Sequence, residues 1–445
     1  MKKTLIKNAR IVNEGVILDG DVYIEGDTIV EVSPSISAKS GDTIIIDAEG
    51  KFLIPGVIDD QVHFREPGLT HKGNIASESA AAVAGGITSF MEMPNTNPQT
   101  TAITDWEKKM EIAAKSSFAN YSFMFGGTND NLAEILKVDE KRVPALKLFL
   151  GSSTGNMLVD NEEVLRNIFS NVKLRIALHC EDEKTIKENL AAAIEEYGDD
   201  IPMSHHPIIR SEDACYISSS RAIALARETG ARIHVFHLST GKETSLFNSS
   251  TDLANKPITA EVCIHHLWFS DQDYNSKGPF IKWNPAVKTP ADRDKLWDAL
   301  LSDKIDVIAT DHAPHTLEEK NNPYLSCPSG GPLVQHALPA MMQFVHDEKI
   351  TIEKVVQKMC HNPAILFEVN DRGFIKEGFK ADLVLIDANN PWTVNKDNIL
   401  AHCGWSPFEG VTFKSRISHT FVNGEIAYQG FKVSKQSYAQ ELSFR

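Results

Sequence analysis

Eight strand-like segments alternate with helical patterns through the middle of the chain, and this alternation constrains the fold more than any other feature. The first segment, residues 52–58, reads as a buried strand, and helical patterns such as 183–197, 213–229 and 291–301 lie between most of the later ones. Eight strand units across roughly 330 residues predict an α/β fold, a (β/α)8 TIM-like barrel. The other seven segments are residues 87–91, 121–125, 145–149, 174–179, 232–237, 258–262 and 307–311.

Both ends of the chain read as β-structure instead. Short apolar runs between residues 4 and 54 are separated by turns, and the same pattern returns at 381–387 and 418–428. We therefore predict a small β-sandwich satellite domain formed by both termini, residues 1–54 and 380–445, beside a barrel of residues 55–379. A chain of 445 residues is long enough for both units.

Charge and cysteine content narrow the class of partner. Acidic residues outnumber basic ones, 60 to 45, for a formal charge of -15, which argues against nucleic acid and against an anionic membrane surface. No apolar run approaches the roughly 20 residues of a membrane span, and the first residues are too polar for a signal peptide. Six scattered cysteines predict reduced, mostly buried thiols in a cytoplasmic protein. We expect a small-molecule substrate, with no nucleic acid and no membrane.

Polar residues follow the first strand at the end where a barrel places its active site. Because side chains i and i+2 of a strand share a face, Asp59, Gln61, His63 and Arg65 are expected to converge at the strand's C-terminal end. A carboxylate, an amide, an imidazole and a guanidinium at one point indicate chemistry rather than packing.

Other strands add histidine, lysine and aspartate to the same edge. A single histidine at a strand end is more often a hydrogen-bonded structural residue than a ligand. Three such histidines, with a lysine inside an apolar run and an aspartate, are a different case, because imidazoles and carboxylates are the ligands of zinc and its neighbours. The predicted metal ligands are His63, Lys147, His179, His237 and Asp311.

Lys147 has two readings. Burial among apolar neighbours desolvates the amine and lowers its pKa. In the first reading, the side chain reaches water or an ion-pair partner. In the second, the neutral amine captures carbon dioxide as a carbamate that bridges two metals. The remaining histidines considered are expected to be structural: His205, His206, His234, His265, His266, His336, His361 and His402. Gly330 and Gly331 lack the context of a phosphate loop and are expected to line a pocket.

Four segments resemble the signatures of the amidohydrolase superfamily, and within it the dihydroorotases. They are residues 63–68 (HFREPG), 93–98 (MPNTNP), 309–315 (ATDHAPH) and 403–408 (CGWSPF). The resemblance covers residues 55 to 387 and is looser in the terminal β-structure. It implies reversible interconversion of dihydroorotate and N-carbamoyl-aspartate, a step of pyrimidine biosynthesis, by a homodimer.

The resemblance also implies roles for the residues of the site. His63 and Asp311 would hold one zinc, His179 and His237 a second, and carbamylated Lys147 would bridge them, giving one or two zinc ions per chain. A metal-activated water would attack the ring amide, with Asp311 as general base and acid. The residues implied in substrate binding are Arg65, Asn95 and His315 on the carboxylate and Asn284 on the ring.

The sequence departs from the family pattern at the first strand. The pattern there is His-x-His, and Gln61 stands at its first position, so the first metal site is expected to be weaker, vacant or rebuilt with another side chain such as Asp59. Residues 284–288 (NPAVK) also differ from the usual NPPLR. Two alternatives therefore stay open: another cyclic amidase (hydantoinase, dihydropyrimidinase or allantoinase), whose substrate carries no equivalent carboxylate, and a catalytically silent homologue that scaffolds a partner.

Overall fold

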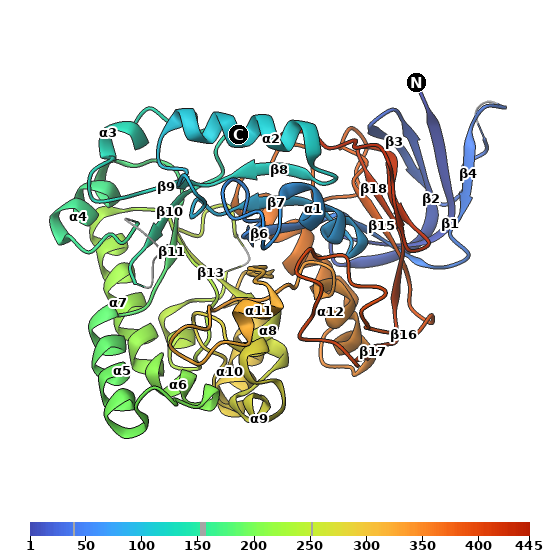
Figure 1. Cartoon of the computed structure of the whole chain (residues 1–445). Helices are drawn as coiled ribbons and strands as arrows, with labels where there is room; N and C mark the ends of the chain where they lie inside the picture. Colours follow the sequence, from blue (N-terminus) through green and yellow to red (C-terminus); the bar gives the residue numbers. More distant parts are fainter. Residues whose placement is uncertain (39–40, 152–156, 251) are drawn as a thin grey trace.

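A barrel of parallel strands lies beside a large sheet built from both ends of the chain (Figure 1). The computed structural model describes residues 1–38, 41–151, 157–250 and 252–445. The barrel strands are β6 (Val57–Val62), β7 (Ile87–Glu92), β8 (Asn120–Phe123), β9 (Phe125–Gly126), β10 (Leu146–Phe149), β11 (Ile176–His179), β12 (Ile233–Val235), β13 (Ile258–Cys263) and β14 (Val307–Ala309).

Parallel pairing carries the barrel from its first strand round to its last. β6, β7 and β8 pair in order, and β9 to β14 pair in order. β8 and β9 together form one strand of the barrel, because only Met124 separates them. The circuit closes where Val62 pairs with His312, beyond β14, and the amide of His63 donates to the carbonyl of His312 at 2.7 Å. The predicted (β/α)8 barrel is confirmed.

The bounds of the first predicted strand were wrong. Residues 52–58 divide between two sheets: β5 (Phe52–Pro55) lies in the terminal sheet, where it pairs with β1 and β15, and β6 begins the barrel at Val57. β6 then runs on to Val62, through residues that the sequence placed beyond the strand. The polar side chains of residues 59–61 are therefore part of the barrel wall.

Helices surround the barrel (Figure 1). The three predicted examples are confirmed within one residue as α5, α7 and α10, and each begins at a side-chain cap: Asp182, Ser211 and Thr289 accept from backbone amides of the first turn. The α-helices are α1 (Ile75–Ala84), α2 (Ile103–Ser116), α3 (Leu132–Ile135), α4 (Glu162–Asn171), α5 (Glu183–Tyr197), α6 (His206–Ile209), α7 (Glu212–Thr229), α8 (Ile264–Trp268), α9 (Tyr274–Lys277), α10 (Pro290–Leu301), α11 (Leu317–Lys320), α12 (Ala337–His346), α13 (Ile352–Val356) and α14 (Asn362–Leu366), with a π-helical turn at Gln357–His361.

The terminal sheet joins strands from both ends of the chain. In spatial order it contains β20 (Lys432–Val433), β19 (Glu425–Gln429), β18 (Arg416–Val422), β15 (Leu383–Asp387), β5, β1 (Lys3–Asn13), β2 (Val16–Glu25) and β3 (Thr28–Ser33), with β4 (Ile44–Asp47) paired to β1. A separate ribbon pairs β16 (Trp392–Thr393) with β17 (Thr412–Phe413). The predicted domain boundaries at residues 54 and 380 stay predictions.

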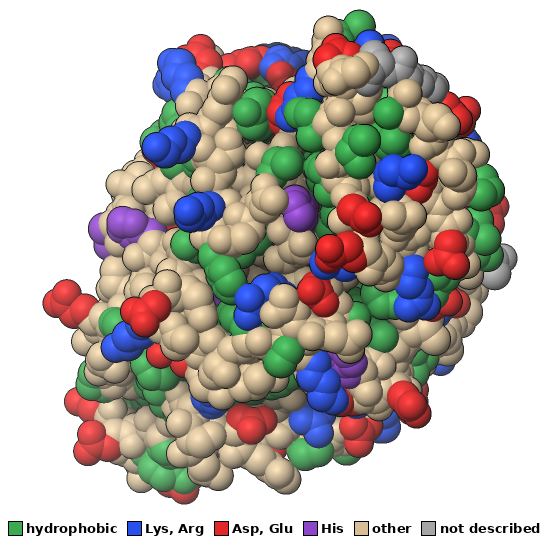
Figure 2. Space-filling model, turned by 90° about the vertical axis from the view of Figure 1, so that its right-hand side faces the viewer, with side chains coloured by type: hydrophobic (Ala, Val, Ile, Leu, Met, Phe, Trp, Pro, Cys, Tyr) green, Lys and Arg blue, Asp and Glu red, His purple; other side chains and the backbone are tan. Residues whose placement is uncertain are grey.

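Four further facts concern the surface, the last residues, the helices and the cysteines. Acidic and basic side chains are interspersed among small groups of hydrophobic ones on the face shown in Figure 2, which is the side of the terminal sheet. The last residues return to the barrel, where the amide of Leu442 donates to Tyr121 of β8 at 2.9 Å. Among the described residues, no helix has the length and apolar character to cross a membrane. All six cysteines are buried and unpaired, as predicted.

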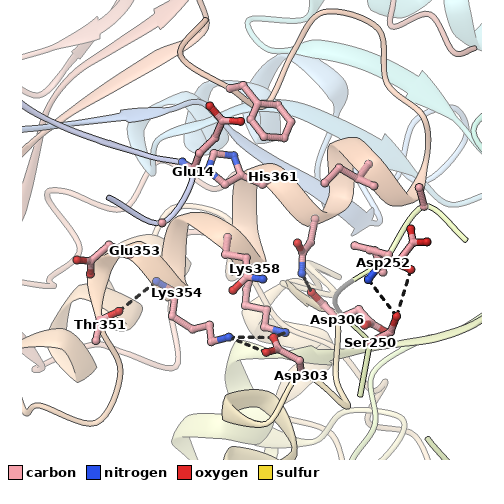
Figure 3. Close-up of a pocket in the computed structure, with 17 residues that line it drawn as sticks. Glu14, Ser250, Asp252, Asp303, Asp306, Thr351, Glu353, Lys354, Lys358 and His361 are labelled. Carbon is pink, nitrogen blue, oxygen red and sulfur yellow. Dashed lines mark hydrogen bonds and ion pairs between the residues drawn. The ribbon is translucent and has the colours of Figure 1, made fainter. Parts of the chain in front are cut away.

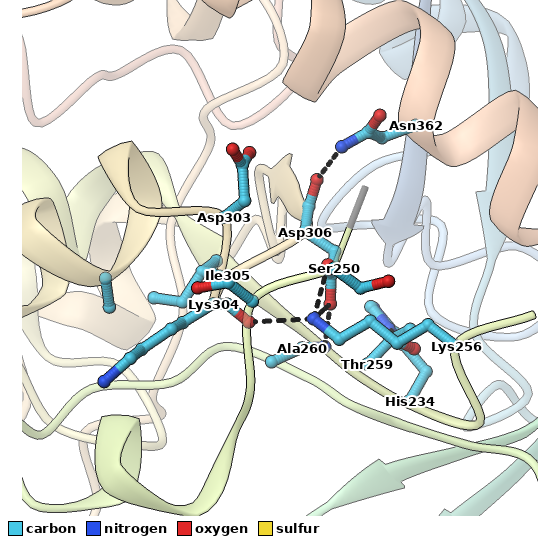
Figure 4. A network of polar contacts seen from close by, with 12 residues as sticks. His234, Ser250, Lys256, Thr259, Ala260, Asp303, Lys304, Ile305, Asp306 and Asn362 are labelled. Carbon is cyan, nitrogen blue, oxygen red and sulfur yellow. Dashed lines mark hydrogen bonds and ion pairs between the residues drawn. The ribbon is translucent and has the colours of Figure 1, made fainter. Parts of the chain in front are cut away.

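A buried ion pair fastens the N-terminal ends of β13 and β14 (Figure 4). The Lys256 amine lies 2.7 and 2.9 Å from the two carboxylate oxygens of Asp306, and Asp306 also accepts from the amide of Ala260. The Asn362 amide donates to the Asp306 carbonyl at 2.6 Å. These contacts lie at the end of the barrel opposite to the candidate active site.

Candidate active site

The predicted ligands lie where β6, β10, β11, β12 and β14 reach the C-terminal end of the barrel. His179 is the last residue of β11, and His237 and Asp311 follow β12 and β14 by two residues. His237 (φ 39°), Asp311 (φ 48°) and Arg65 (φ 71°) have left-handed backbone conformations, which non-glycine residues rarely adopt. Strained conformations of this kind cluster at functional sites, because the fold must hold the side chain in one direction.

His63 and Asp311 form the first pair of the site. The Nε2 atom of His63 lies 3.2 Å from Oδ1 of Asp311, and its Nδ1 lies 2.8 Å from Oδ1 of Asn95. Burial lowers the pKa of His63 well below its usual value, so the ring is neutral. Since the Asn95 oxygen can only accept, Nδ1 carries the ring proton and Nε2 directs a lone pair at Asp311. Burial also raises the pKa of Asp311 to about 7.

His179 and His237 form the second pair. Nδ1 of His179 lies 3.0 Å from Nε2 of His237, with the rings at 80° to one another. Nε2 of His179 lies 2.8 Å from Oε2 of Glu181, so a proton on that nitrogen leaves the Nδ1 lone pair facing His237. Burial lowers the pKa of both imidazoles. Two neutral rings with nitrogens this close are arranged like a pair of metal ligands.

Lys147 acts electrostatically on both pairs. Its charge affects the pKa values of His63, His237 and Asp311, and its amine sits 4.0 Å from the ring centre of Phe236. The residue is 1% exposed, and this burial lowers the pKa of the amine to about 7. A buried lysine with a lowered pKa has a neutral form available near pH 7, and a neutral amine is a nucleophile.

These residues fit a divalent transition-metal cation. The donor set combines imidazole nitrogens with a carboxylate, the ligands that zinc accepts. His63 and His179 are each held at the far ring nitrogen, by Asn95 and Glu181, and metal-binding imidazoles are oriented in this way. The lone pairs of His63 and Asp311 also face one another at 3.2 Å, which a cation or a shared proton must relieve.

Gln61 and Asp59 are engaged inside the barrel wall. The amide oxygen of Gln61 accepts from the thiol of Cys263 at 3.7 Å. Asp59 accepts from the hydroxyl of Thr310 at 2.6 Å and from its amide at 3.2 Å. The expected convergence with His63 and Arg65 is therefore incomplete. The side chains of Gln61 and Asp59 lie lower in the barrel, where they contact β13 and the end of β14.

Arg65 and His315 meet at the mouth of the barrel. Nη2 of Arg65 lies 3.0 Å from Nε2 of His315, and its Nε donates to the Pro314 carbonyl at 3.1 Å. Burial lowers the pKa of Arg65 to about 10, so the guanidinium stays charged at neutral pH. Asn95 contacts His63, and the Asn284 side-chain oxygen is buried without a hydrogen-bond partner among the described residues. Of the four predicted substrate contacts, Asn95 thus contacts a predicted metal ligand, and Arg65 and His315 contact each other.

The loops that carry Arg65 and Asn95 pack against each other. Gly68 has a φ of +85°, and a Cβ atom there would lie 2.0 Å from the carbonyl oxygen of Asn97. The amide of Asn97 donates to the Pro67 carbonyl at 3.1 Å. Glycine is therefore required at residue 68 to bring the two segments into contact.

Sequence reasoning missed Glu181, which contacts both His179 and Arg210. Burial alone would raise the pKa of this carboxyl, but Arg210 and His179 hold it at about 2. The sequence contained a signal, because Glu181 follows a strand-end histidine by two residues. Its partner Arg210 lies before α7 and shows no comparable signal.

A second buried group was also missed: Asp60, His234 and Glu261, whose ligand atoms lie within 4.8 Å of one another. The sequence classed His234 as structural and gave Asp60 no role. Several other histidines classed in the same way do bond to the fold: His206 to Tyr324 and Trp283, His336 to Ser406 and His361 to Gly373.

A cavity of about 560 Å³ opens at the other end of the barrel (Figure 3). Asp303 lies in it, ahead of β14, and accepts from Lys354 at 2.9 and 3.0 Å, while the Lys358 amine is 2.8 Å away. The Asp303 carboxylate is thus paired with two lysines of the protein. None of the predicted site residues lines this cavity, so the chemistry belongs to the opposite end.

The chain matches the model of the Amidohydrolase family over residues 52–427. Similar proteins include the dihydroorotase of Carboxydothermus hydrogenoformans, 34% identical over 96% of this chain and 98% of that one. The dihydroorotase of Methanosarcina acetivorans is 32% identical over 91% and 88%. Among solved structures, the L-hydantoinase (dihydropyrimidinase) of Arthrobacter aurescens superposes with a TM-score of 0.94 at 26% identity, covering 100% of both chains.

Proposed function

Because the chain belongs to the amidohydrolase family and is a metal-dependent cyclic amide hydrolase, we propose that it is a dihydroorotase. The observation that carries the proposal is Arg65, a buried and charged guanidinium that contacts His315 at the rim of the candidate metal centre. A ring that bears a carboxylate would meet this guanidinium while its amide faces Asp311. The reaction is the reversible opening of dihydroorotate to N-carbamoyl-aspartate, a step of pyrimidine biosynthesis.

The metal would be held by the two pairs described above. His179 and His237 would bind one cation, and His63 with Asp311 would bind the other, with zinc as the expected metal. When bound, such a cation lowers the pKa of a water molecule and polarises an amide carbonyl. Gln61 provides no imidazole to the first position, so we expect that position to bind more weakly than the His179–His237 pair.

Lys147 is proposed to carry a carbamate. Its neutral amine attacks carbon dioxide, forms an N–C bond and releases one proton, which turns a neutral side chain into an anionic one. The support is its burial, its lowered pKa of about 7 and its electrostatic effect on members of both pairs. An anion there would balance the charge of the bound cations.

Asp311 is proposed to move the proton. Its carboxylate accepts a proton from the attacking water and delivers it to the ring nitrogen as the carbon–nitrogen bond breaks. The pKa of about 7 suits both halves of this transfer, because efficient proton carriers titrate near the working pH. His63 holds the carboxylate from one side at 3.2 Å.

The test compares two substrates that differ only in the carboxylate, dihydroorotate and dihydrouracil. The metal-loaded wild type should open dihydroorotate far faster. Arg65→Met should lower kcat/KM for dihydroorotate by about 10²–10³-fold, because a desolvated charged contact is lost, and should leave dihydrouracil unaffected. Lys108→Met is the control, because it removes an exposed cation that is paired with Asp105 and lies outside the site, and it should leave both rates unchanged. Equal rates on both rings in the wild type would refute the proposal.

A hydantoinase-type activity is the second candidate. It is favoured by the superposition on the L-hydantoinase of Arthrobacter aurescens, with a TM-score of 0.94. The same assay separates the two, because hydantoin and dihydrouracil carry no carboxylate for Arg65. A homodimer also remains a prediction, to be measured by light scattering.

A further inference from the structure

A buried group of two carboxylates and one imidazole lies inside the barrel, beneath the candidate active site. Asp60 of β6, His234 of β12 and Glu261 of β13 are each fully buried. Nε2 of His234 lies 3.4 Å from Oδ2 of Asp60 and 3.4 Å from Oε2 of Glu261. The three ligand atoms lie within 4.8 Å of one another, so one small ion can contact all of them.

A bulge in β6 turns Asp60 toward the interior. From Asp59 to Val62 this strand advances three residues, while its partner β7 advances two, from Phe90 to Glu92. The extra residue breaks the alternation of side chains, so that Asp60 joins its neighbours on the inner side. Bulges recur next to active sites, where they redirect a side chain.

Contacts around His234 hold its ring with Nε2 toward the two carboxylates. Nδ1 of His234 lies 2.9 Å from the hydroxyl oxygen of Thr259, which lies 3.1 Å from the Ile233 carbonyl. When Nδ1 carries the ring proton, the Nε2 lone pair faces Asp60 and Glu261. Figure 4 shows His234 beside Thr259. Burial keeps this ring neutral by lowering its pKa.

The two carboxylates likewise present free oxygens to the same point. Both oxygens of Asp60 are buried without a hydrogen-bond partner among the described residues. Glu261 uses its Oε1 to accept from the amide of His237 at 3.1 Å and directs Oε2 at His234. Burial beside Asp60 raises the pKa of Glu261 well above its usual value, so either a proton or a cation must lie among these three groups, and their ligand atoms are close enough for one cation to contact all of them.

Charge balance points the same way. Two buried carboxylates are costly without a counter-charge, and one divalent cation would neutralise both. The amine of Lys147 acts on Glu261, but it sits over the ring of Phe236 and not in this group. A set of two oxygens and one imidazole nitrogen suits zinc and its neighbours better than calcium or magnesium, which prefer oxygen ligands alone.

We propose that Asp60, His234 and Glu261 bind a divalent transition-metal cation of the zinc class, separate from the centre at the barrel mouth. The ion joins three strands of the barrel, and Glu261 holds the amide of His237, so the site supports the strained backbone at that residue. The inference does not rest on the dihydroorotase assignment. If the chain binds this ion but does not open dihydroorotate, the proposed activity is disproved and the interior metal site stands.

The test locates zinc directly. Full-length protein stripped with a chelator is reloaded with Zn²⁺ alone, crystallised, and measured on both sides of the zinc absorption edge. The expected result is an anomalous peak between Asp60, His234 and Glu261, in addition to density at the mouth. Wild-type crystals without a peak in the interior overturn the proposal.

Elemental analysis of variants gives a second readout. Asp60→Asn should bind one zinc fewer per chain than the wild type, and Asp59→Asn, a neighbouring buried carboxylate bonded to Thr310, should lose none. A folded Asp60→Asn protein with unchanged zinc content overturns the proposal. If Asp60→Asn fails to fold, the wild-type anomalous peak alone decides.

Discussion

Replacing Glu181 by glutamine should weaken metal binding without touching a metal ligand. Glu181 is fully buried and lies 2.8 Å from Nε2 of His179, where it holds the ring proton away from the face that meets His237. Glutamine keeps the shape and loses the charge. The tautomer of His179 is then no longer fixed, and its Nδ1 lone pair is directed at the metal for only part of the time.

The contact between the Glu181 carboxylate and the His179 ring sets the size of the effect. The pKa of about 2 is a net result, in which Arg210 and His179 outweigh the desolvation of the buried carboxyl. Loss of such a contact behind a metal ligand typically weakens binding by about 10–100-fold. We therefore expect metal affinity to fall by about 10–100-fold.

The assay is competition for Zn²⁺ against a chromophoric chelator, together with the rate of ring opening at rising zinc concentration. Glu181→Gln should regain most of its activity in excess zinc, because only affinity is reduced. Glu183→Gln, two residues further on and partly exposed, is the matched control and should bind as the wild type does. A folded Glu181→Gln protein with wild-type zinc affinity would refute the role given to this carboxylate.

Three further predictions concern the ion pair, the proton carrier and the departure from the family pattern. Lys109→Met should destabilise the fold by about 3–5 kcal/mol, measured by chemical denaturation, because Glu92 would remain buried without its partner; a loss below 1 kcal/mol would contradict this. Folded Asp311 keeps its proton up to about pH 7 while the unfolded chain releases it near 3.9, so Asp311 contributes stability to the metal-free protein that is lost as the pH rises from about 4 to 7. Asp311→Asn should remove this contribution, on the order of 2–4 kcal/mol in the difference between the wild-type and variant profiles, and parallel profiles would count against it. Gln61→His should raise the zinc affinity at His63, measured by the same competition; no gain would show that this position is not a ligand position.

Much of the fold and of the site could be predicted because parallel strands end at one edge. The eight strands, three helices and the meeting of His63, Lys147, His179, His237 and Asp311 at the barrel mouth all follow from strand periodicity and chain order. Arg65 and His315 were paired by the family resemblance, and their side chains do meet.

The misses have physical reasons. Residues 52–58 form one apolar run, and only the pairing of β5 with β1 and β15 shows that the run serves two sheets. The inward direction of Asp60 depends on a bulge, which the two-residue period of a strand does not reveal. Arg210 reaches Glu181 through tertiary packing that no local pattern encodes.

Metal reconstitution followed in one sample tests the central claim most directly. Chelator-stripped protein is titrated with Zn²⁺ while bound zinc and the opening of dihydroorotate are measured together, beside a His179→Ala variant. The account predicts that ring opening rises with zinc bound at the barrel mouth, and that the variant loses both. A folded, zinc-loaded wild type that opens no dihydroorotate would contradict it.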